Sequence, residues 1–209
     1  MFNRILRYLF FAIFVHPLVL IILGLNVRHR ERLPKKGPAI IVANHNSHLD
    51  TLVLMSLFPT LPHPIAAADY FLRNRILAWF ALKIIGIIPI QRTIKAHSDP
   101  FEAAYNALSE GKILILFPEG TRGKPEQMDK FKSGIAHLAK NNPQIPVIPI
   151  FIHGLGKALP KGESVFVPFF CDIFVGEALP FCENKKQYME QLDSAMQQLA
   201  KEGMFAPWK

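Results

Sequence analysis

Two short polar segments stand out in this 209-residue chain because each carries residue types that can do chemistry. Residues 44–50 read Asn-His-Asn-Ser-His-Leu-Asp, and residues 117–122 read Phe-Pro-Glu-Gly-Thr-Arg. Each segment follows a run of aliphatic residues that is typical of a buried strand. Loops that follow buried strands are where α/β proteins usually hold their functional side chains. A histidine beside a carboxylate can act as a general base, and an arginine can bind an anion.

Within the first segment, the spacing of His45 and Asp50 favours a histidine base that is held by a carboxylate. Ser47 and Asp50 fit the acidic form of the capping box, which places Ser47 just before a helix and Asp50 at its third position. Side chains in a helix lean toward its N-terminus, so the Asp50 carboxylate can reach back to the imidazole. The carboxylate would fix the tautomer, and the helix N-terminus would favour the neutral imidazole that a base requires.

The same residues allow three other interpretations. Asp50 could do no more than cap the helix, because such caps are common. His45, His48 and Asp50 could bind a metal ion, although no second cluster of ligands is evident. Ser47 could be an acyl-enzyme nucleophile, although it lacks the G-x-S-x-G elbow. The base hypothesis requires no metal, and it makes His48 a solvated or structural residue near the helix start.

Arginine occurs at the ends of two apolar runs, where its planar fork can make paired hydrogen bonds to an anion. Arg92 follows the run 86–90, and Arg122 closes the second polar segment. We therefore predict that these arginines bind an anionic group such as a phosphate. Alternatively, Glu119 and Arg122 could form an internal salt bridge that only shapes the turn.

The two segments together resemble the signature of the PlsC-type glycerolipid acyltransferase family. The likeness rests on HxxxxD preceded by Asn, followed further along by FPEGTR, and covers roughly residues 28–180. In that family the histidine deprotonates the acceptor hydroxyl and the aspartate orients it, so the resemblance gives these roles to His45 and Asp50. The segment 131–134 also fits a family pattern, which makes Lys132 a further candidate for phosphate binding.

The resemblance also assigns an acceptor site. It comprises Arg92, Glu119, Gly120, Thr121 and Arg122, with the arginines facing the phosphate. A glycine at position 120 would let the backbone approach the ligand closely.

The activity that the resemblance implies is acyl transfer to 1-acylglycerol-3-phosphate (lysophosphatidic acid), giving phosphatidic acid in phospholipid biosynthesis. The donor would be a thioester, either acyl-CoA or acyl-acyl carrier protein, and no other cofactor is expected. Another lysophospholipid acceptor remains an alternative. So do a metal-dependent or serine lipid hydrolase and a non-catalytic lipid-binding or scaffold protein.

The amino-acid composition indicates which kinds of molecule the protein binds. The hydrophobic fraction of 50% and the charged fraction of 19% argue against disorder. A net charge of +8 favours anionic partners such as membrane phospholipids, the lysophospholipid or an acidic carrier protein. No nucleic-acid-binding motif is present, so nucleic acid is not an expected partner. Cys171 and Cys182 lie in no metal-binding or redox spacing, which fits a reduced compartment.

The apolar run 8–25 is interrupted only by His16 and Pro17 and has basic flanks, which predicts a membrane-anchoring helix. We expect residues 1–27 to form this anchor and residues 28–209 to form the acyltransferase domain. Pro17 leaves open a clean span or a kinked, half-inserted anchor, and a buried core helix is the remaining alternative. No cleavage site of small residues follows, so the run is not a signal peptide. The heavier basic flank on its C-terminal side favours the cytoplasmic face of the cell inner membrane.

The rest of the chain alternates between strand-like and helix-like segments, which predicts an α/β fold with a single mixed sheet covered by helices. The expected strands are 39–43, 84–90, 113–117, 147–152 and 164–175. The expected helices are 51–58, 69–83, 99–110, 132–141 and 185–202.

Overall fold

The computed structural model describes residues 2–71, 74–91, 99–159, 165–182 and 184–205. Its centre is a seven-stranded sheet with the order β1-β7-β6-β2-β5-β3-β4. The strands are β1 (Leu25–Arg28), β2 (Ala39–Ala43), β3 (His63–Ala67), β4 (Ile88–Ile90), β5 (Ile113–Leu116), β6 (Val147–His153) and β7 (Cys171–Val175). Neighbouring strands pair in parallel except β6 and β7, which are antiparallel, so the predicted mixed sheet is confirmed.

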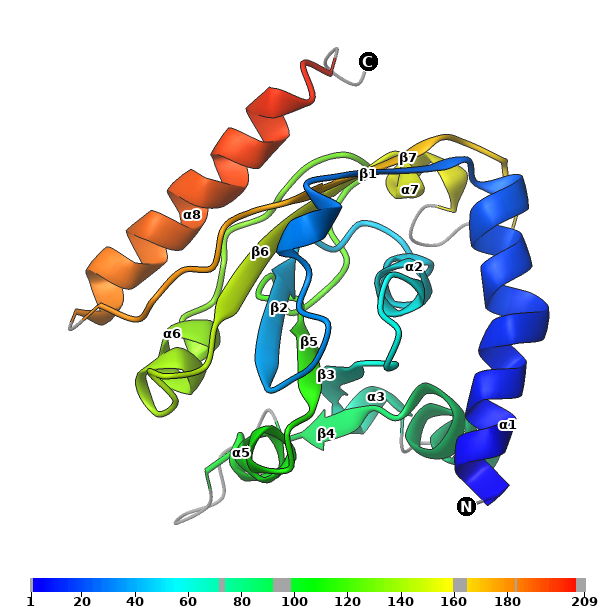
Figure 1. Cartoon of the computed structure of the whole chain (residues 1–209), viewed down its shortest axis with the longest axis horizontal. Coiled ribbons are helices and arrows are strands. Elements are labelled where there is room, and N and C mark those ends of the chain that lie inside the picture. The colour runs from blue at the N-terminus through cyan, green and yellow to red at the C-terminus, as the bar shows by residue number, and fades with distance from the viewer. Residues whose placement is uncertain (1, 72–73, 92–98, 160–164, 183, 206–209) are drawn as a thin grey trace.

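Helices cover both faces of this sheet (Figure 1). One face packs against α2 (Asp50–Ser56) and the N-terminal helix, and the other packs against α5 (Glu102–Ser109), α6 (Gly134–Lys140) and α8 (Lys185–Glu202). The central strands β2, β5 and β6 are buried along their whole length, which explains their nearly continuous aliphatic sequences.

Shorter helical segments complete the chain. They are α3 (Ala68–Phe71), α4 (Arg75–Trp79), α7 (Leu155–Ala158), the 3₁₀ turn η3 (Arg30–Arg32) and the π-helical turns η1 (Phe11–Val15), η2 (Leu18–Ile22) and η4 (Phe80–Ile85). The helices expected at 51–58, 99–110, 132–141 and 185–202 are all present, with differences at their ends.

The N-terminal helix runs without interruption from Phe2 to Ile22 and is long and apolar enough to cross a membrane. It begins as α1 (Phe2–Phe10) and passes through Pro17 with ordinary helical backbone angles, so the kink that the proline suggested is not seen. One stripe of this helix belongs to the core of the domain. Its members are each 1% exposed and recur every four residues, namely Phe11, Val15, Val19 and, directly after the last helical residue, Leu23.

Three expectations about local structure were wrong. The helix expected over 69–83 is divided, because the side chain of Asn74 accepts hydrogen bonds from the backbone and starts α4 as a new helix. Residues 84 and 85 end η4 rather than beginning a strand, so β4 is shorter than predicted. The strand expected over 164–175 begins only at Cys171, because residues 165–170 are mostly exposed and form no strand. In addition, strands β1 and β3 were not predicted, and β1 extends across the boundary expected after residue 27.

The strands that precede the two polar segments lie side by side and point in the same direction. β2 pairs with β5 on one side and with β6 on the other, all in parallel. Their carboxyl ends therefore meet at one edge of the sheet, and the segments that follow β2 and β5 share that edge.

Candidate active site

The structure brings His45 and Asp50 into direct contact. The imidazole Nδ1 lies 2.8 Å from the Asp50 Oδ2. The His45 side chain is 19% exposed, whereas the Asp50 side chain is only 1% exposed. Because Nδ1 donates to the carboxylate, Nε2 is the unprotonated nitrogen of a neutral imidazole and can accept a proton. This is the arrangement that the spacing predicted.

Asp50 is itself held by the backbone of the loop. Its Oδ2 also accepts hydrogen bonds from the backbone N–H groups of Asn46 and Ser47, at 2.7 and 2.8 Å. The bond from the Ser47 N–H to Asp50 is one of the two bonds of a capping box, whereas the Ser47 hydroxyl accepts from the Leu49 N–H at 3.2 Å and not from the Asp50 N–H. Regular helix nevertheless begins at Asp50, which is the first residue of α2 and not its third.

The second polar segment, residues 117–122, also holds both the ring and the backbone of His45. The ring of Phe117 stacks on the ring of His45 with centroids 4.1 Å apart. The backbone N–H of His45 donates to the Glu119 Oε1 at 2.9 Å, and the backbone carbonyl of His45 accepts from the backbone N–H of Gly123 at 2.9 Å. The second polar segment therefore positions the base as well as lying beside it.

Two buried asparagines contribute to this arrangement; Asn44 entered the sequence analysis only as part of the motif, and Asn46 was not singled out. Asn44 exchanges hydrogen bonds with the backbone of Ile152 in β6, at 2.9 and 2.7 Å. Asn46 donates to the carbonyls of Lys124 and Gln127, at 2.6 and 2.8 Å. Amides that flank a base directly after an apolar strand are a usable signal, because buried amides must find partners.

Arg122 lies close to the dyad but does not pair with Glu119. Its guanidinium contacts the imidazole of His48, which gives His48 a definite partner. Burial lowers the pKa of His48, and the charges of Arg122 and His45 lower it further. Neutral His48 can accept a hydrogen bond from the arginine and thereby orient it.

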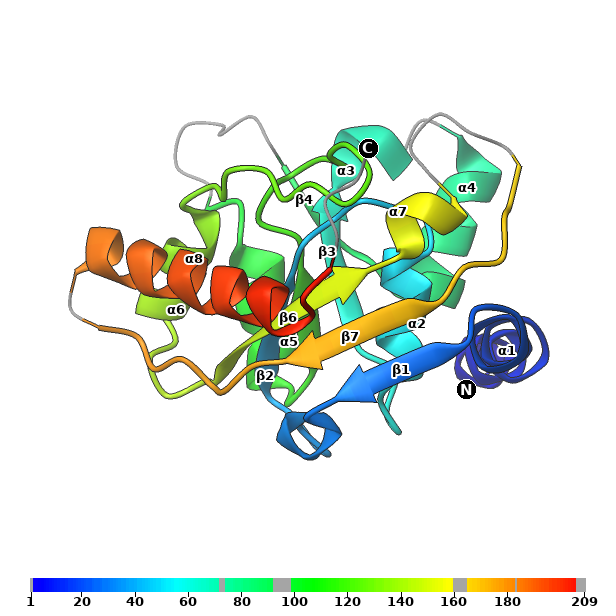
Figure 2. The same cartoon turned by 90° about the horizontal axis from the view of Figure 1, so that it is seen from above.

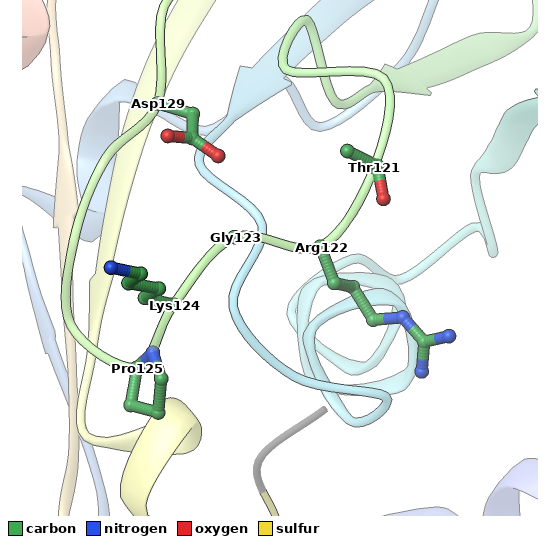
Figure 3. A pocket seen from close by; sticks show the side chains of 6 residues that line it. All are labelled: Thr121, Arg122, Gly123, Lys124, Pro125 and Asp129. Carbon is green, nitrogen blue, oxygen red and sulfur yellow. The ribbon is translucent and has the colours of Figure 1, made fainter. Parts of the chain in front are cut away.

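A hollow in the surface lies along the same loop. It is lined by Thr121, Arg122, Gly123, Lys124, Pro125 and Asp129. Figure 3 shows Thr121 and Arg122 on one arm of this loop, with the guanidinium pointing away from Asp129. His45 is not among the lining residues, so the hollow adjoins the base without containing it.

Gly120 and Lys132 form a close contact at the start of this loop. Gly120 has a φ of +73°, a conformation that favours glycine. A Cβ atom at this position would lie 2.6 Å from the Lys132 Nζ, so a side chain here would displace the end of the lysine. The two predicted residues are therefore brought together, whereas Arg92 lies outside the described residues.

Glu119 is a buried acid whose carboxylate faces the backbone of the base. Burial raises the pKa of Glu119 to about 7, although the N–H groups of His45 and Asp129 act in the opposite direction. The residue is 3% exposed. Its place in the structure favours a role in shaping the loop that carries Arg122.

A second histidine–carboxylate pair, not foreseen from the sequence, holds the far end of the same loop. Glu126 Oε2 lies 2.7 Å from the His153 Nδ1 and accepts from the Gly154 N–H at 2.9 Å. Burial raises the pKa of Glu126, but these two hydrogen bonds outweigh it and the pKa is lowered overall. Among the described residues, no group of three or more His, Cys, Asp or Glu side chains is arranged to hold a metal ion.

The His45–Asp50 pair can act as a general base beside an arginine-bearing loop, and comparison with known proteins gives the class of the protein. A family model described as Acyltransferase matches residues 24–153. The chain therefore belongs to the acyltransferase family.

Named relatives agree with this assignment. The chain is 31% identical over 165 residues to the 1-acyl-sn-glycerol-3-phosphate acyltransferase LPAT1, chloroplastic, of Arabidopsis thaliana, which covers 78% of this chain and 44% of that protein. It is 33% identical over 156 residues to the human 1-acyl-sn-glycerol-3-phosphate acyltransferase alpha, covering 74% of this chain and 54% of the relative. The chain thus spans about half the length of the curated relatives it matches.

A solved structure has the same fold. The crystal structure of the 1-acyl-sn-glycerophosphate acyltransferase PlsC from Thermotoga maritima superposes with a TM-score of 0.78 and covers 99% of this chain and 83% of that one. The sequence identity is 20%, so this likeness establishes the fold.

Proposed function

We propose that the protein transfers a fatty acyl group from a thioester to the free hydroxyl of 1-acylglycerol-3-phosphate, giving phosphatidic acid. The observation that carries this proposal is the His45–Asp50 pair, 2.8 Å apart, beside a loop that presents Arg122. The names of the relatives support the acceptor. The donor, acyl-CoA or acyl-acyl carrier protein, comes from the family resemblance.

In the proposed reaction, His45 acts as the general base. Nε2 takes the proton of the acceptor hydroxyl while the hydroxyl oxygen bonds to the thioester carbonyl carbon. Collapse of the tetrahedral intermediate breaks the carbon–sulfur bond, and the imidazolium returns its proton to the leaving sulfur. Asp50 stabilises the imidazolium throughout and keeps the ring oriented. Such base catalysis typically contributes about 10²–10⁴-fold in rate.

Binding of the acceptor phosphate is assigned to the loop that follows β5. Arg122 and Thr121 line the hollow, and the end of Lys132 lies beside Gly120 nearby. Bidentate guanidinium–phosphate contacts would fix the hydroxyl relative to the base. Glu119 supports this site through the His45 backbone, and Arg92 is proposed as a second phosphate ligand.

A matrix of acceptors and donors tests this function. The purified protein is given lysophosphatidic acid, lysophosphatidylcholine or monoacylglycerol, each with acyl-CoA or with acyl-acyl carrier protein. We expect phosphatidic acid from lysophosphatidic acid with at least one donor, and its loss in His45→Ala. A preference for lysophosphatidylcholine would show that this lipid, and not lysophosphatidic acid, is the acceptor. Release of free fatty acid without transfer would indicate a hydrolase.

The protein is further proposed to attach to the membrane through an apolar surface rather than to span it. Four side chains of the N-terminal helix are buried in the domain, so lipid cannot surround the helix completely. Figure 2 shows this helix, α4 and the segment before β7 at the same end of the molecule. Exposed apolar side chains come from all three, namely Ile13, Phe14, Leu20, Ile21, Ile76, Trp79, Val165 and Phe170.

Paired substitutions test this attachment without removing core residues. Ile13 and Leu20 are 59% and 67% exposed, so Ile13→Gln/Leu20→Gln should leave thermal stability unchanged while lowering the affinity for vesicles at least about tenfold. Met204→Gln, at a residue that is 89% exposed, is the matched control. Unchanged vesicle binding in the double variant would place the attachment elsewhere. The cytoplasmic face of the inner membrane is the proposed side, and a C-terminal reporter that is active only outside the cytoplasm would contradict it.

A further inference from the structure

A basic cavity of about 750 Å³ lies between the start of the N-terminal helix and the end of η4. Five of its lining residues are basic, namely Arg4, Arg7, Lys36, Lys83 and Lys112. The single acid in the lining is Glu110, and its carboxylate already pairs with Lys112. The described residues that line the cavity therefore carry a net positive charge.

This cavity is separate from the candidate active site. Gly37 and Ile113, which also line it, lie at the amino ends of β2 and β5, whereas His45 and Glu119 follow their carboxyl ends. The length of β2, about 15 Å, therefore stands between them. An acceptor phosphate held in this cavity could not place its hydroxyl at His45.

Arg7 is the most enclosed of the cations. Its guanidinium donates to the carbonyl of Pro62 at 2.6 Å and lies 3.4 Å from both the Leu61 carbonyl and the His63 Nε2. All three partners are neutral, because His63 Nδ1 donates to the Gly86 carbonyl and leaves Nε2 as an acceptor. In the part of the chain that the structure describes, no carboxylate pairs with Arg7. Burial lowers the pKa of Arg7 to about 10, an effect that an added anion would oppose.

The cavity lies next to the apolar surface. At about 100° per residue, Arg4 and Arg7 share one side of α1, whereas Phe2, Ile5 and Leu9 share the opposite side. These three apolar side chains are 76%, 51% and 48% exposed. Figure 1 shows the N-terminal end of α1 beside the helical segment that follows α3, which supplies Lys83 to the cavity. A lipid beside the N-terminal end of α1 can therefore lay its acyl chains against the apolar side and reach around that end of the helix with its phosphate toward the basic groups.

We propose that this cavity binds the phosphate of an anionic phospholipid and thereby orients the protein on the membrane. The ligand is a structural lipid that takes no part in the reaction. The inference rests on the membrane attachment proposed above, but it is independent of the acyl-transfer activity.

Vesicle binding without turnover tests the proposal. The full-length protein is titrated with phosphatidylcholine vesicles and with vesicles that also contain phosphatidylglycerol. Arg4→Gln/Lys83→Gln removes two cavity charges, and Lys140→Gln/Lys201→Gln removes two exposed charges on other helices as the matched control. We expect the first variant to lose at least about tenfold of the preference for phosphatidylglycerol, whereas the control keeps it. Both variants should keep wild-type acyl transfer in detergent micelles.

A charge-neutral variant separates a specific cavity from diffuse attraction. Thr60 is exposed and lines the cavity, so Thr60→Trp should obstruct part of it without changing its charge and reduce the same preference. A preference that survives Thr60→Trp, or that falls equally in the Lys140/Lys201 control, would overturn the proposal. Competition by millimolar inorganic phosphate at constant ionic strength would assign the cavity to a soluble phosphate compound instead. Absence of binding to either vesicle would contradict the membrane attachment as well, whereas equal binding to both would contradict the cavity alone.

Discussion

Two histidine–carboxylate pairs of nearly the same geometry lie at one edge of the sheet. His45 and Asp50 are 2.8 Å apart, and His153 and Glu126 are 2.7 Å apart, with Nδ1 as the contacting nitrogen in both. Both carboxylates also accept backbone hydrogen bonds. The hydrogen-bonded pair is therefore not what distinguishes a base from a structural histidine.

The surroundings of the two rings differ. The ring of His45 is 19% exposed and adjoins the loop that presents Arg122. The ring of His153 is 11% exposed and adjoins no such loop arginine in the part of the chain that the structure describes. Each ring is stacked on a phenylalanine, Phe205 for His153 and Phe117 for His45, so stacking does not separate them. Between them runs the loop 119–126, whose two ends are held by the two pairs. We infer that the first pair does chemistry and that the second holds the loop in place.

The largest expected difference between the two pairs is in kcat when the carboxylic acid of each pair is changed to its amide. Asp50→Asn removes the charge that stabilises the imidazolium, and we expect kcat to fall about 10³-fold. Glu126→Gln makes the same change in the second pair and should alter kcat less than about threefold. Steady-state kinetics at saturating substrates compare them directly. Equal losses would mean that the second pair takes part in the reaction.

Stability should show the opposite contrast. His153→Ala leaves the carboxylate of Glu126, whose side chain is 4% exposed, without its partner, and should lower the free energy of unfolding by about 3 kcal/mol. Adding Glu126→Gln removes the buried charge, so the double variant should be more stable than His153→Ala alone. Denaturant unfolding measures both. A double variant that is less stable than the single one would show that the charge of Glu126 is balanced elsewhere.

Substitution of Arg122 tests whether the loop between the two pairs binds the acceptor phosphate. Arg122→Ala should lower kcat/KM for lysophosphatidic acid by about 30- to 150-fold, which corresponds to the loss of about 2–3 kcal/mol from a charged bidentate contact. The KM for the donor should change little. Monoacylglycerol, which lacks the phosphate, is the control acceptor and should be used equally by the variant and the wild type. An effect confined to the donor would reassign Arg122.

Glu119 gives the smallest expected effect, and it depends on pH. Its pKa is raised from about 4.5 to about 7 in the folded protein, so the folded state binds more protons between these values. Stability from this group is present below pH 4.5, falls as the pH rises to 7 and is then constant. Glu119→Gln lacks this dependence, so its stability relative to the wild type should rise by about 1–3 kcal/mol between pH 5 and pH 8. Thermal unfolding at the two pH values measures the difference, and a constant difference would contradict the raised pKa.

Sequence reasoning succeeded where the interaction is local. His45 and Asp50 are five residues apart, so a turn and a helix start suffice to join them. The boundaries of α8 (Lys185–Glu202) also follow from its sequence, because Asn184 caps the helix. Aliphatic runs gave the buried strands β2, β5 and β6, which have core on both faces.

Nonlocal features escaped prediction for identifiable reasons. Strands β1 (Leu25–Arg28) and β3 (His63–Ala67) are only partly buried and contain polar residues or proline, so they lack the strand pattern. The His153–Glu126 pair joins the end of β6 to a loop with φ of +56° at Glu126, and neither partner predicts the other. The contact between Arg122 and His48 likewise depends on β2 and β5 lying side by side.

One pair of matched variants tests the central claim most directly. The side-chain amide of asparagine can replace the Nδ1–H donor of histidine, so His45→Asn and His153→Asn both keep the bond to the carboxylate and both lose Nε2. Initial rates of phosphatidic acid formation are measured for the two variants and the wild type under the same conditions. We predict that His45→Asn loses at least about 10³-fold in kcat and that His153→Asn stays within about threefold of the wild type. A His45→Asn enzyme with more than a tenth of the wild-type rate would contradict the assignment of His45 as the base.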